Sequence, residues 1–246
     1  MHNWRALLVL CLLLLPGAPA RAQLRLDLEA GAAFNGYNDV RIPRGTGTPI
    51  SLSEELSSDP AGFFRLRVEY AWSGATRLSL LAAPLRILAS GSVPRAVSFD
   101  GVTFPARAPL RSRYRFDSYR LTYRFDFRRQ GALQAGIGVT AKIRDAAIRL
   151  ESDGLRAEKS NTGVVPLVNF RLLWRPAARF GMLLEGDALA APQGRAEDVL
   201  AALQVEAGPR LALRLGYRVL EGGADVDEVY NFTLVHYASA GVALTF

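Results

Sequence analysis

The stretch YNFTLVHYASAGVALTF, residues 230–246, alternates apolar and polar side chains with period two. One face would carry the apolar residues Phe232, Leu234, Ala238, Ala240, Val242, Leu244 and Phe246. The other would carry the polar or small residues Asn231, Thr233, Ser239, Gly241 and Thr245. Alternation of this kind predicts a β-strand with one apolar face. The strand continues to the aromatic residue Phe246.

The same pattern recurs in about ten runs after Gln23, most clearly in Ala132–Ile143. Further runs cover residues 24–34, 64–72, 164–174 and 211–219, and in each the charges keep to one face. An arginine or lysine facing lipid at the middle of a bilayer would cost about 2–4 kcal/mol, so this segregation is what a membrane-spanning barrel requires. No stretch after residue 22 approaches the length of apolar sequence that a transmembrane helix needs.

The alternating strands and the terminal aromatic Phe246 resemble those of bacterial, Gram-negative outer-membrane β-barrels as a general class. The resemblance implies an all-β fold, a transmembrane antiparallel up-and-down barrel in the cell outer membrane. It also implies that the barrel-assembly machinery reads the closing strand through Phe246.

The N-terminal segment predicts a cleaved signal peptide over residues 1–22, followed by the barrel over residues 23–246. Arg5 precedes the apolar run Ala6–Leu15, and Ala20-Arg21-Ala22 supplies a small-residue cleavage site. Cys11 is the only cysteine, so the expected mature chain has no cysteine chemistry. It carries 28 basic residues against 23 acidic ones, a scattered excess that argues against binding nucleic acid.

Long and short connections alternate along the chain and predict which end of the barrel faces outward. Short turns are expected at residues 73–75, 128–131, 176–179 and 207–209, in the periplasm. Long loops are expected near residues 38–60, 91–112, 151–162, 191–196 and 221–228. These connections join ten strands, or eight if Thr76–Ala89, interrupted by Pro84, and a neighbour are misread.

Aromatic residues provide an independent prediction of the membrane boundaries, because they collect at lipid–water interfaces. The expected periplasmic girdle consists of Trp72, Phe125, Phe127, Trp174, Phe180 and Phe246. The expected outer girdle consists of Phe34, Tyr119, Tyr217 and Phe232.

Charged residues of both signs are predicted to face the lumen. The candidates for a lumen charge network or a pore lining are Arg65, Arg67, Glu69, Arg120, Arg124, Lys142, Arg144, Arg171, Glu185, Asp187, Arg214 and Arg218. Eight strands are just filled by side chains, and ten lie near that limit. The favoured interpretation is a charged, largely plugged lumen in a structural or surface-binding protein. The alternative is restricted passage of small solutes, in which the basic excess would favour anions.

An enzyme is the less favoured hypothesis, and no catalytic residue, metal site or cofactor is predicted. Outer-membrane proteases with ten strands use an acid–histidine pair on extracellular loops, whereas His236, the single histidine after residue 22, falls on the last strand. A membrane-embedded lipid-modifying enzyme would need a histidine near a serine, but Ser239 lies on the opposite face of that strand. A hydroxyl or carboxylate partner on the face of His236 itself would keep this alternative open.

Three arginines above the outer girdle are candidates for contact with lipopolysaccharide. Arg113 and Arg115 share the outward face of one strand, and Arg149 should lie nearby on the next. Arginine recognises phosphate groups through paired hydrogen bonds. The expected partners are therefore outer-membrane lipid, lipopolysaccharide and the assembly machinery, and the chain is expected to be monomeric.

Overall fold

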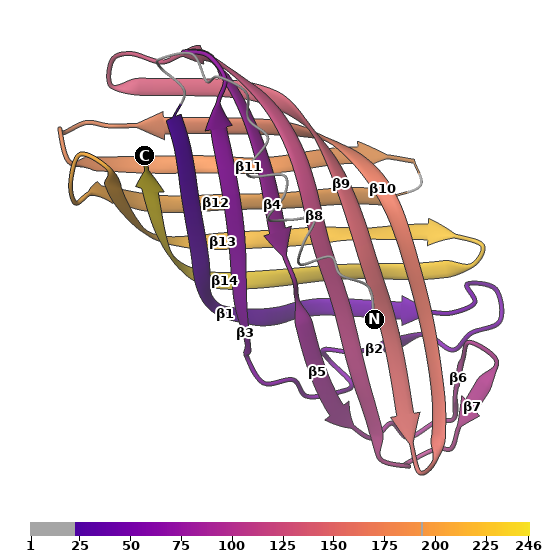
Figure 1. Ribbon diagram of the computed structural model, residues 1–246. Helices are drawn as coiled ribbons and strands as arrows, with labels where there is room; N and C mark the ends of the chain where they lie inside the picture. Colours follow the sequence, from indigo (N-terminus) through magenta and orange to yellow (C-terminus); the bar gives the residue numbers. More distant parts are fainter. Residues whose placement is uncertain (1–22, 193) are drawn as a thin grey trace, which may run out of the picture.

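The chain forms a β-sheet that closes on itself. A computed structural model describes residues 23–192 and 194–246 (Figure 1); the predicted signal peptide lies outside these residues. Strand β1 (Gln23–Arg41) pairs antiparallel with β3 (Ala61–Ala71) on one side and with the last strand, β14 (Val229–Thr245), on the other. The closure extends to the chain end, where the Phe246 amide donates to the Leu24 carbonyl at 2.8 Å.

The result is a closed antiparallel barrel of ten strands, as predicted. Between β3 and β14 the sheet runs through β4 (Thr76–Ala83), β8 (Leu110–Arg128), β9 (Leu133–Ser152), β10 (Leu155–Trp174), β11 (Phe180–Ala191), β12 (Gly194–Glu206) and β13 (Leu211–Val226). A further strand, β5 (Arg86–Gly91), continues the position of β4, since both pair with β8. The break between them contains Pro84, which cannot donate to a ladder.

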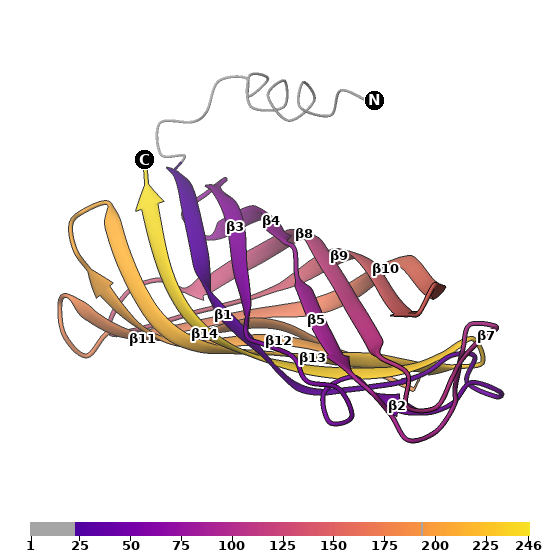
Figure 2. The same ribbon diagram turned by 90° about the horizontal axis from the view of Figure 1, so that it is seen from below.

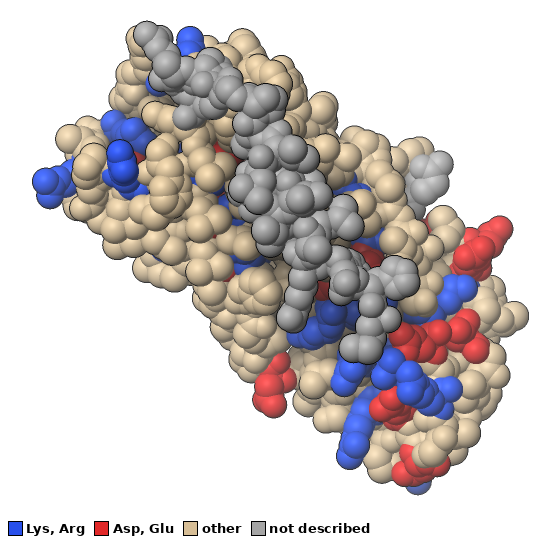
Figure 3. Space-filling model, viewed as in Figure 1, with Lys and Arg blue, Asp and Glu red and all other residues tan. Residues whose placement is uncertain are grey.

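The outer surface of the barrel is a belt of exposed apolar side chains. Leu80, Leu121, Val139, Leu203 and Leu215 are among its large members, and uncharged residues cover much of the barrel side in Figure 3, whereas charges gather toward its lower right end. All six residues of the predicted periplasmic girdle are exposed. Of the outer girdle, Phe34, Tyr119 and Tyr217 are exposed, while Phe232 is half-buried beside Tyr230 and Arg195.

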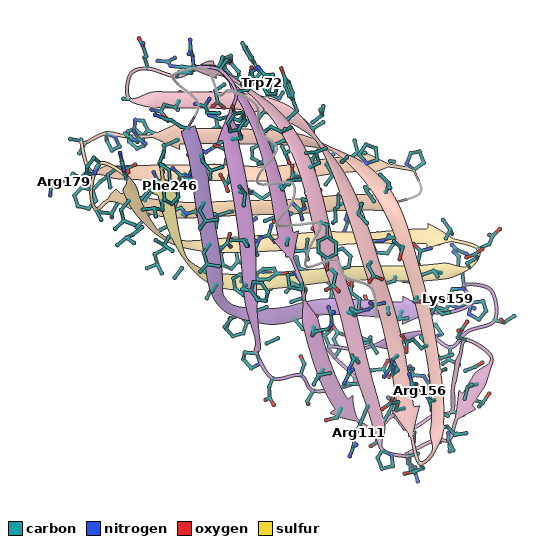
Figure 4. The ribbon with its side chains drawn as sticks, in the orientation of Figure 1. Trp72, Arg111, Arg156, Lys159, Arg179 and Phe246 are labelled. Carbon is teal, nitrogen blue, oxygen red and sulfur yellow. The ribbon has the colours of Figure 1, made fainter. Side chains whose placement is uncertain are left out.

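The two ends of the barrel differ in how far the strands extend, and the two long connections, residues 42–60 and 92–109, lie at the same end. Trp72 and Phe246 lie at the end with short turns, and Arg111 and Arg156 lie at the opposite end, where β8, β9 and β10 extend past their neighbours (Figure 4). This extended end carries the short strand β2 (Ile50–Ser51) and the hairpin of β6 (Val97–Phe99) and β7 (Val102–Phe104) (Figure 2).

The loops of the extended end enclose an apolar core inside the outer half of the barrel. Its buried members include Ile42, Leu52 and Phe99 from the loops and Phe63 and Tyr237 from the barrel wall. The rings of Phe63 and Tyr237 meet edge to face at 4.8 Å. The outer half of the lumen is therefore largely apolar and the loops above it are packed against it.

Three predicted long loops are wrong. Residues 151–162 and 221–228 are largely strand, because β9 and β10 are separated only by Asp153-Gly154, and β13 and β14 only by Asp227-Glu228. Residues 191–196 include the start of β12 at Gly194. Beyond the membrane the outward face of these strands meets water and no longer has to be apolar, so the alternation weakens. Pairing continues because inward residues such as Ile148, Leu150 and Ala157 pack in the loop-covered core.

Candidate functional site

Three arginines and three carboxylates meet across the lumen between the two girdles; we call them the upper ionic layer. The arginines are Arg65, Arg120 and Arg218, and the carboxylates are Glu29, Asp187 and Asp198. All six side chains are buried. The layer is electroneutral and joins β1, β3, β8, β11, β12 and β13 through the interior of the barrel.

Asp198 is the centre of this layer. Its carboxylate accepts hydrogen bonds from Arg65 at 2.9 Å and from Arg120 and Arg218. Arg218 also donates to both oxygens of Glu29, at 2.8 and 2.7 Å. Paired hydrogen bonds between guanidinium and carboxylate fix the geometry as well as contributing energy. A network satisfied in this way rigidifies a buried polar core.

Asp187 ties the layer to neutral side chains. It accepts from Arg120 at 2.6 Å, from the Thr140 hydroxyl at 2.6 Å and from the Asn169 amide at 2.8 Å. Thr122 shares a hydrogen bond of 2.8 Å with Thr140. These contacts fill the lumen on the β8–β11 side.

A second set of charges lies on the periplasmic side of the first; we call it the lower ionic layer. Glu185 pairs with Arg67 at 2.8 Å, with Arg171 at 3.5 Å and with Arg214 at 3.9 Å. Asp27 also pairs with Arg214. The lumen is therefore crossed twice by ion pairs.

Nearer the periplasm, Arg124 bridges Glu69 at 3.0 Å and Asp126 at 2.8 Å. These residues and the lower layer line a polar cavity of about 160 Å³ at the end with short turns. The cavity is a vestibule below the two layers.

Lys142 and Arg144 belong to neither layer. Lys142 is the register partner of Arg120 on β9, but among the described residues no carboxylate oxygen lies within 4.0 Å of its Nζ. Its ammonium instead lies 4.7 Å from the centre of the Phe116 ring. Arg144 donates to Asn161, and its Nε has no hydrogen-bond partner. The twelve predicted lumen residues thus divide into ten that form ion pairs and two that do not.

Sequence reasoning missed Asp198. The signal was present, since Asp198 shares its strand parity with the polar residues Gln204 and Glu206 in the run before the predicted turn at residues 207–209. Because residues 191–196 were predicted to form a loop, Asp198 fell next to that loop and was not recognised as part of a strand; it lies within β12.

The three candidate lipopolysaccharide contacts lie together on the outward face above the belt. Arg113 and Arg149 are direct register partners. However, Arg115 pairs with Asp145 at 2.7 Å and Arg149 with Glu158 at 2.5 Å. Of these three arginines, Arg113 alone has no carboxylate within 4.0 Å of its guanidinium among the described residues.

His236 lies on the outer face of β14, and Ser239 faces the lumen, where it is buried, so the predicted opposition of the two side chains is observed. The partner of His236 is the hydroxyl of Tyr217, which is hydrogen-bonded to Nδ1. Among the described residues no carboxylate lies within 4.0 Å of the imidazole. This pair stands at the outer girdle and faces lipid.

In the described part of the chain, no helix is long and apolar enough to span a membrane. Within the same residues, no group of three or more His, Cys, Asp or Glu side chains is placed to hold a metal ion.

Solved structures similar to this one are outer-membrane barrels. The outer membrane protease OmpT from Escherichia coli has a TM-score of 0.56 and 8% sequence identity, with 91% of this chain and 97% of that chain covered. Ail, the attachment invasion locus protein of Yersinia pestis, has a TM-score of 0.40 and 11% identity, with 91% and 99% covered. A likeness to OmpT at this identity concerns the fold alone.

Sequence comparison identifies no family. No family model matches the chain. A curated relative, 1-deoxy-D-xylulose-5-phosphate synthase of Xanthomonas euvesicatoria pv. vesicatoria (strain 85-10), is 26% identical over 166 residues, which are 67% of this chain and 22% of that protein. The chain thus spans about a fifth of that relative's length.

The closed ten-stranded barrel, its apolar belt and its girdles define the class. The chain is a Gram-negative outer-membrane β-barrel protein and resides in the outer membrane.

Proposed function

We propose that this protein is a non-conducting barrel that acts at the cell surface as a structural or binding protein. The observation that carries the proposal is the upper ionic layer, in which three buried arginines are neutralised by three buried carboxylates across the lumen. A solute would have to break several of these pairs, and breaking one buried pair costs about 3–5 kcal/mol.

The balanced charges of this layer also argue against an anion-selective pore. Selectivity filters built from side chains use rings of one sign of charge. Here each arginine of the upper layer is already bonded to a carboxylate, so no ring of free positive charge crosses the lumen. Restricted passage of small solutes is the outcome that would contradict the proposal.

We propose no catalytic role for His236. Its hydroxyl partner, Tyr217, keeps the lipid-modifying alternative formally open. Among the described residues, however, no carboxylate lies within 4.0 Å of the imidazole to orient it as a catalytic base. The girdle position of both rings favours membrane anchoring.

Two partners follow from the surface of the barrel. Arg113 is the candidate contact for a lipopolysaccharide phosphate, because Arg115 and Arg149 are already paired with acids. Phe246, exposed at the end of β14, is the candidate residue for recognition by the assembly machinery. We propose a monomer, since β1 and β14 pair with each other and close the sheet, so neither terminal strand has a free edge for a second copy.

Efflux from proteoliposomes tests the proposal. Vesicles loaded with chloride, glucose or arginine and containing the folded protein should release each solute no faster than protein-free vesicles. Release of any of these solutes at a rate proportional to the protein content would contradict a closed lumen. Folding in the same vesicles is checked by heat-modifiable migration in gels.

A further inference from the structure

A cavity of about 600 Å³ occupies the outer half of the lumen, above the upper ionic layer. Apolar residues supply much of its lining, among them Phe116, Ile148, Val164, Leu189 and Leu220. The volume is in the range of sites that enclose small organic ligands. The upper layer and the periplasmic vestibule do not contribute to it.

The cavity contains a cation that has no anion. Lys142 lines it, is 2% exposed, and has neither a carboxylate nor a hydrogen-bond acceptor within reach among the described residues. The nearest anions of the upper layer are bonded to arginines. Arg144, also in the lining, adds a second positive charge with an unsatisfied Nε. A buried charge without a partner is costly, so this position favours an anionic ligand group.

The wall of the barrel is open beside this cation. Pairing between β10 and β11 ends at Val168 and Ala188, whereas β10 continues to Leu155 along β9 alone. If the pairing continued in the same register, Pro166 would lie opposite Ala190. Proline has no N–H to donate to the ladder, so it cannot support this continuation. On β10, which forms one side of this opening, Val165 is the register partner of Lys142 on β9. Figure 1 shows β10 diverging from the β11–β12 hairpin in this region.

The opening lies at the outer edge of the lipid-facing belt. Val164 pairs with Ile143, which pairs with Tyr119 of the outer girdle. Val164 lines the cavity and is nevertheless 71% exposed. Leu189 has the inward parity of Asp187 and is still 37% exposed. Residues that both line a cavity and reach the surface mark its mouth.

We propose that the cavity is a binding site for a single-chain amphiphile with one carboxylate, of the fatty-acid type, which enters from the outer leaflet through the gap between β10 and β11. The carboxylate pairs with Lys142, and Arg144 adds positive charge beside it. The apolar chain lies against Val164, Pro166 and Leu189 in the gap. The opening at membrane height supplies an apolar chain directly from lipid, which an opening to water would not.

The head-group contact is tested by comparing two ligands that differ only at the head. The protein, purified from outer membranes into phosphatidylcholine nanodiscs, is titrated with radiolabelled hexadecanoate and hexadecan-1-ol. Hexadecanoate should bind at least tenfold more tightly, because hydrogen bonds to charged groups contribute more than this factor when desolvated. Lys142→Met should abolish the difference.

Lys159→Met is the matched control. Lys159 also lines the cavity but stands at its rim, 31% exposed in its side chain and 3.9 Å from Glu228. Lys159→Met should leave the tighter binding of hexadecanoate over hexadecan-1-ol unchanged. Equal binding of acid and alcohol, or equal effects of the two substitutions, would overturn the proposed head-group site.

The entry route is tested by closing the gap. Pro166→Cys and Ala190→Cys together place two thiols across it, joined by oxidation or by a short bis-maleimide; the only native cysteine, Cys11, lies in the predicted signal peptide. The closed form should take up hexadecanoate at least tenfold more slowly than the reduced form of the same protein. An unchanged rate would overturn entry through the wall. The cavity lies above the upper ionic layer, so these results stand apart from any leak of solute through the lumen.

Discussion

Replacing Asp198 with asparagine should destabilise the barrel more than any change to a surface carboxylate. The substitution preserves size and removes one negative charge, which leaves Arg65, Arg120 and Arg218 with two carboxylates in place of three. Breaking a buried ion pair from one side costs about 3–5 kcal/mol. With an m-value near 3 kcal/mol/M, the urea midpoint should fall by about 1–2 M.

The assay is equilibrium unfolding in urea, followed by tryptophan fluorescence and by heat-modifiable migration. Asp225→Asn is the control, because Asp225 is exposed near the end of β13 and pairs only with Arg44 of the loop after β1 among the described residues, so the substitution should leave the midpoint unchanged. Adding Arg65→Met to Asp198→Asn restores charge balance and should recover part of the loss. A midpoint for Asp198→Asn equal to that of the control would refute the central role assigned to the upper layer.

Three further predictions concern the surface and the ends of the barrel. A hydrogen bond from Arg95 holds the pKa of Glu55 below its usual value. This loop contact therefore stabilises above about pH 4.3 and is lost as the pH falls through the lowered pKa. Amide exchange in residues 42–60, measured relative to the intrinsic exchange rate at each pH, should accelerate only on acidification below that point, and a flat profile would contradict the prediction. Arg113→Glu should reduce copurifying lipopolysaccharide more than Arg149→Glu, measured by phosphate content, and equal retention would refute a specific contact. Deleting Phe246 should slow insertion of the barrel in cells by pulse-chase, and wild-type kinetics would remove its proposed recognition role.

The membrane-spanning part of the fold could be predicted from the sequence, because lipid and lumen impose opposite polarity on alternate residues. Ala132–Ile143 illustrates this: the predicted run lies almost entirely within β9. Pro84 likewise predicted an interruption, which is observed between β4 and β5. The extracellular extensions could not be predicted in the same way, since their outward faces meet water and are no longer required to be apolar.

The partners within the lumen could not be predicted, because they depend on the relative height of strands far apart in the chain. Lys142 was predicted to join the charge network, yet it lies beside Arg120 with no acid in reach. Asp198 was missed although it holds three arginines together. The gap beside Pro166 depends on where β11 ends relative to β10, which no local pattern encodes.

The most direct test of the account is single-channel recording of the folded protein in planar bilayers under a salt gradient. The two ionic layers predict no discrete conductance steps in a preparation whose folding is verified by heat-modifiable migration. Reproducible steps, with a reversal potential that favours anions, would contradict the closed lumen and assign the same arginines to a pore.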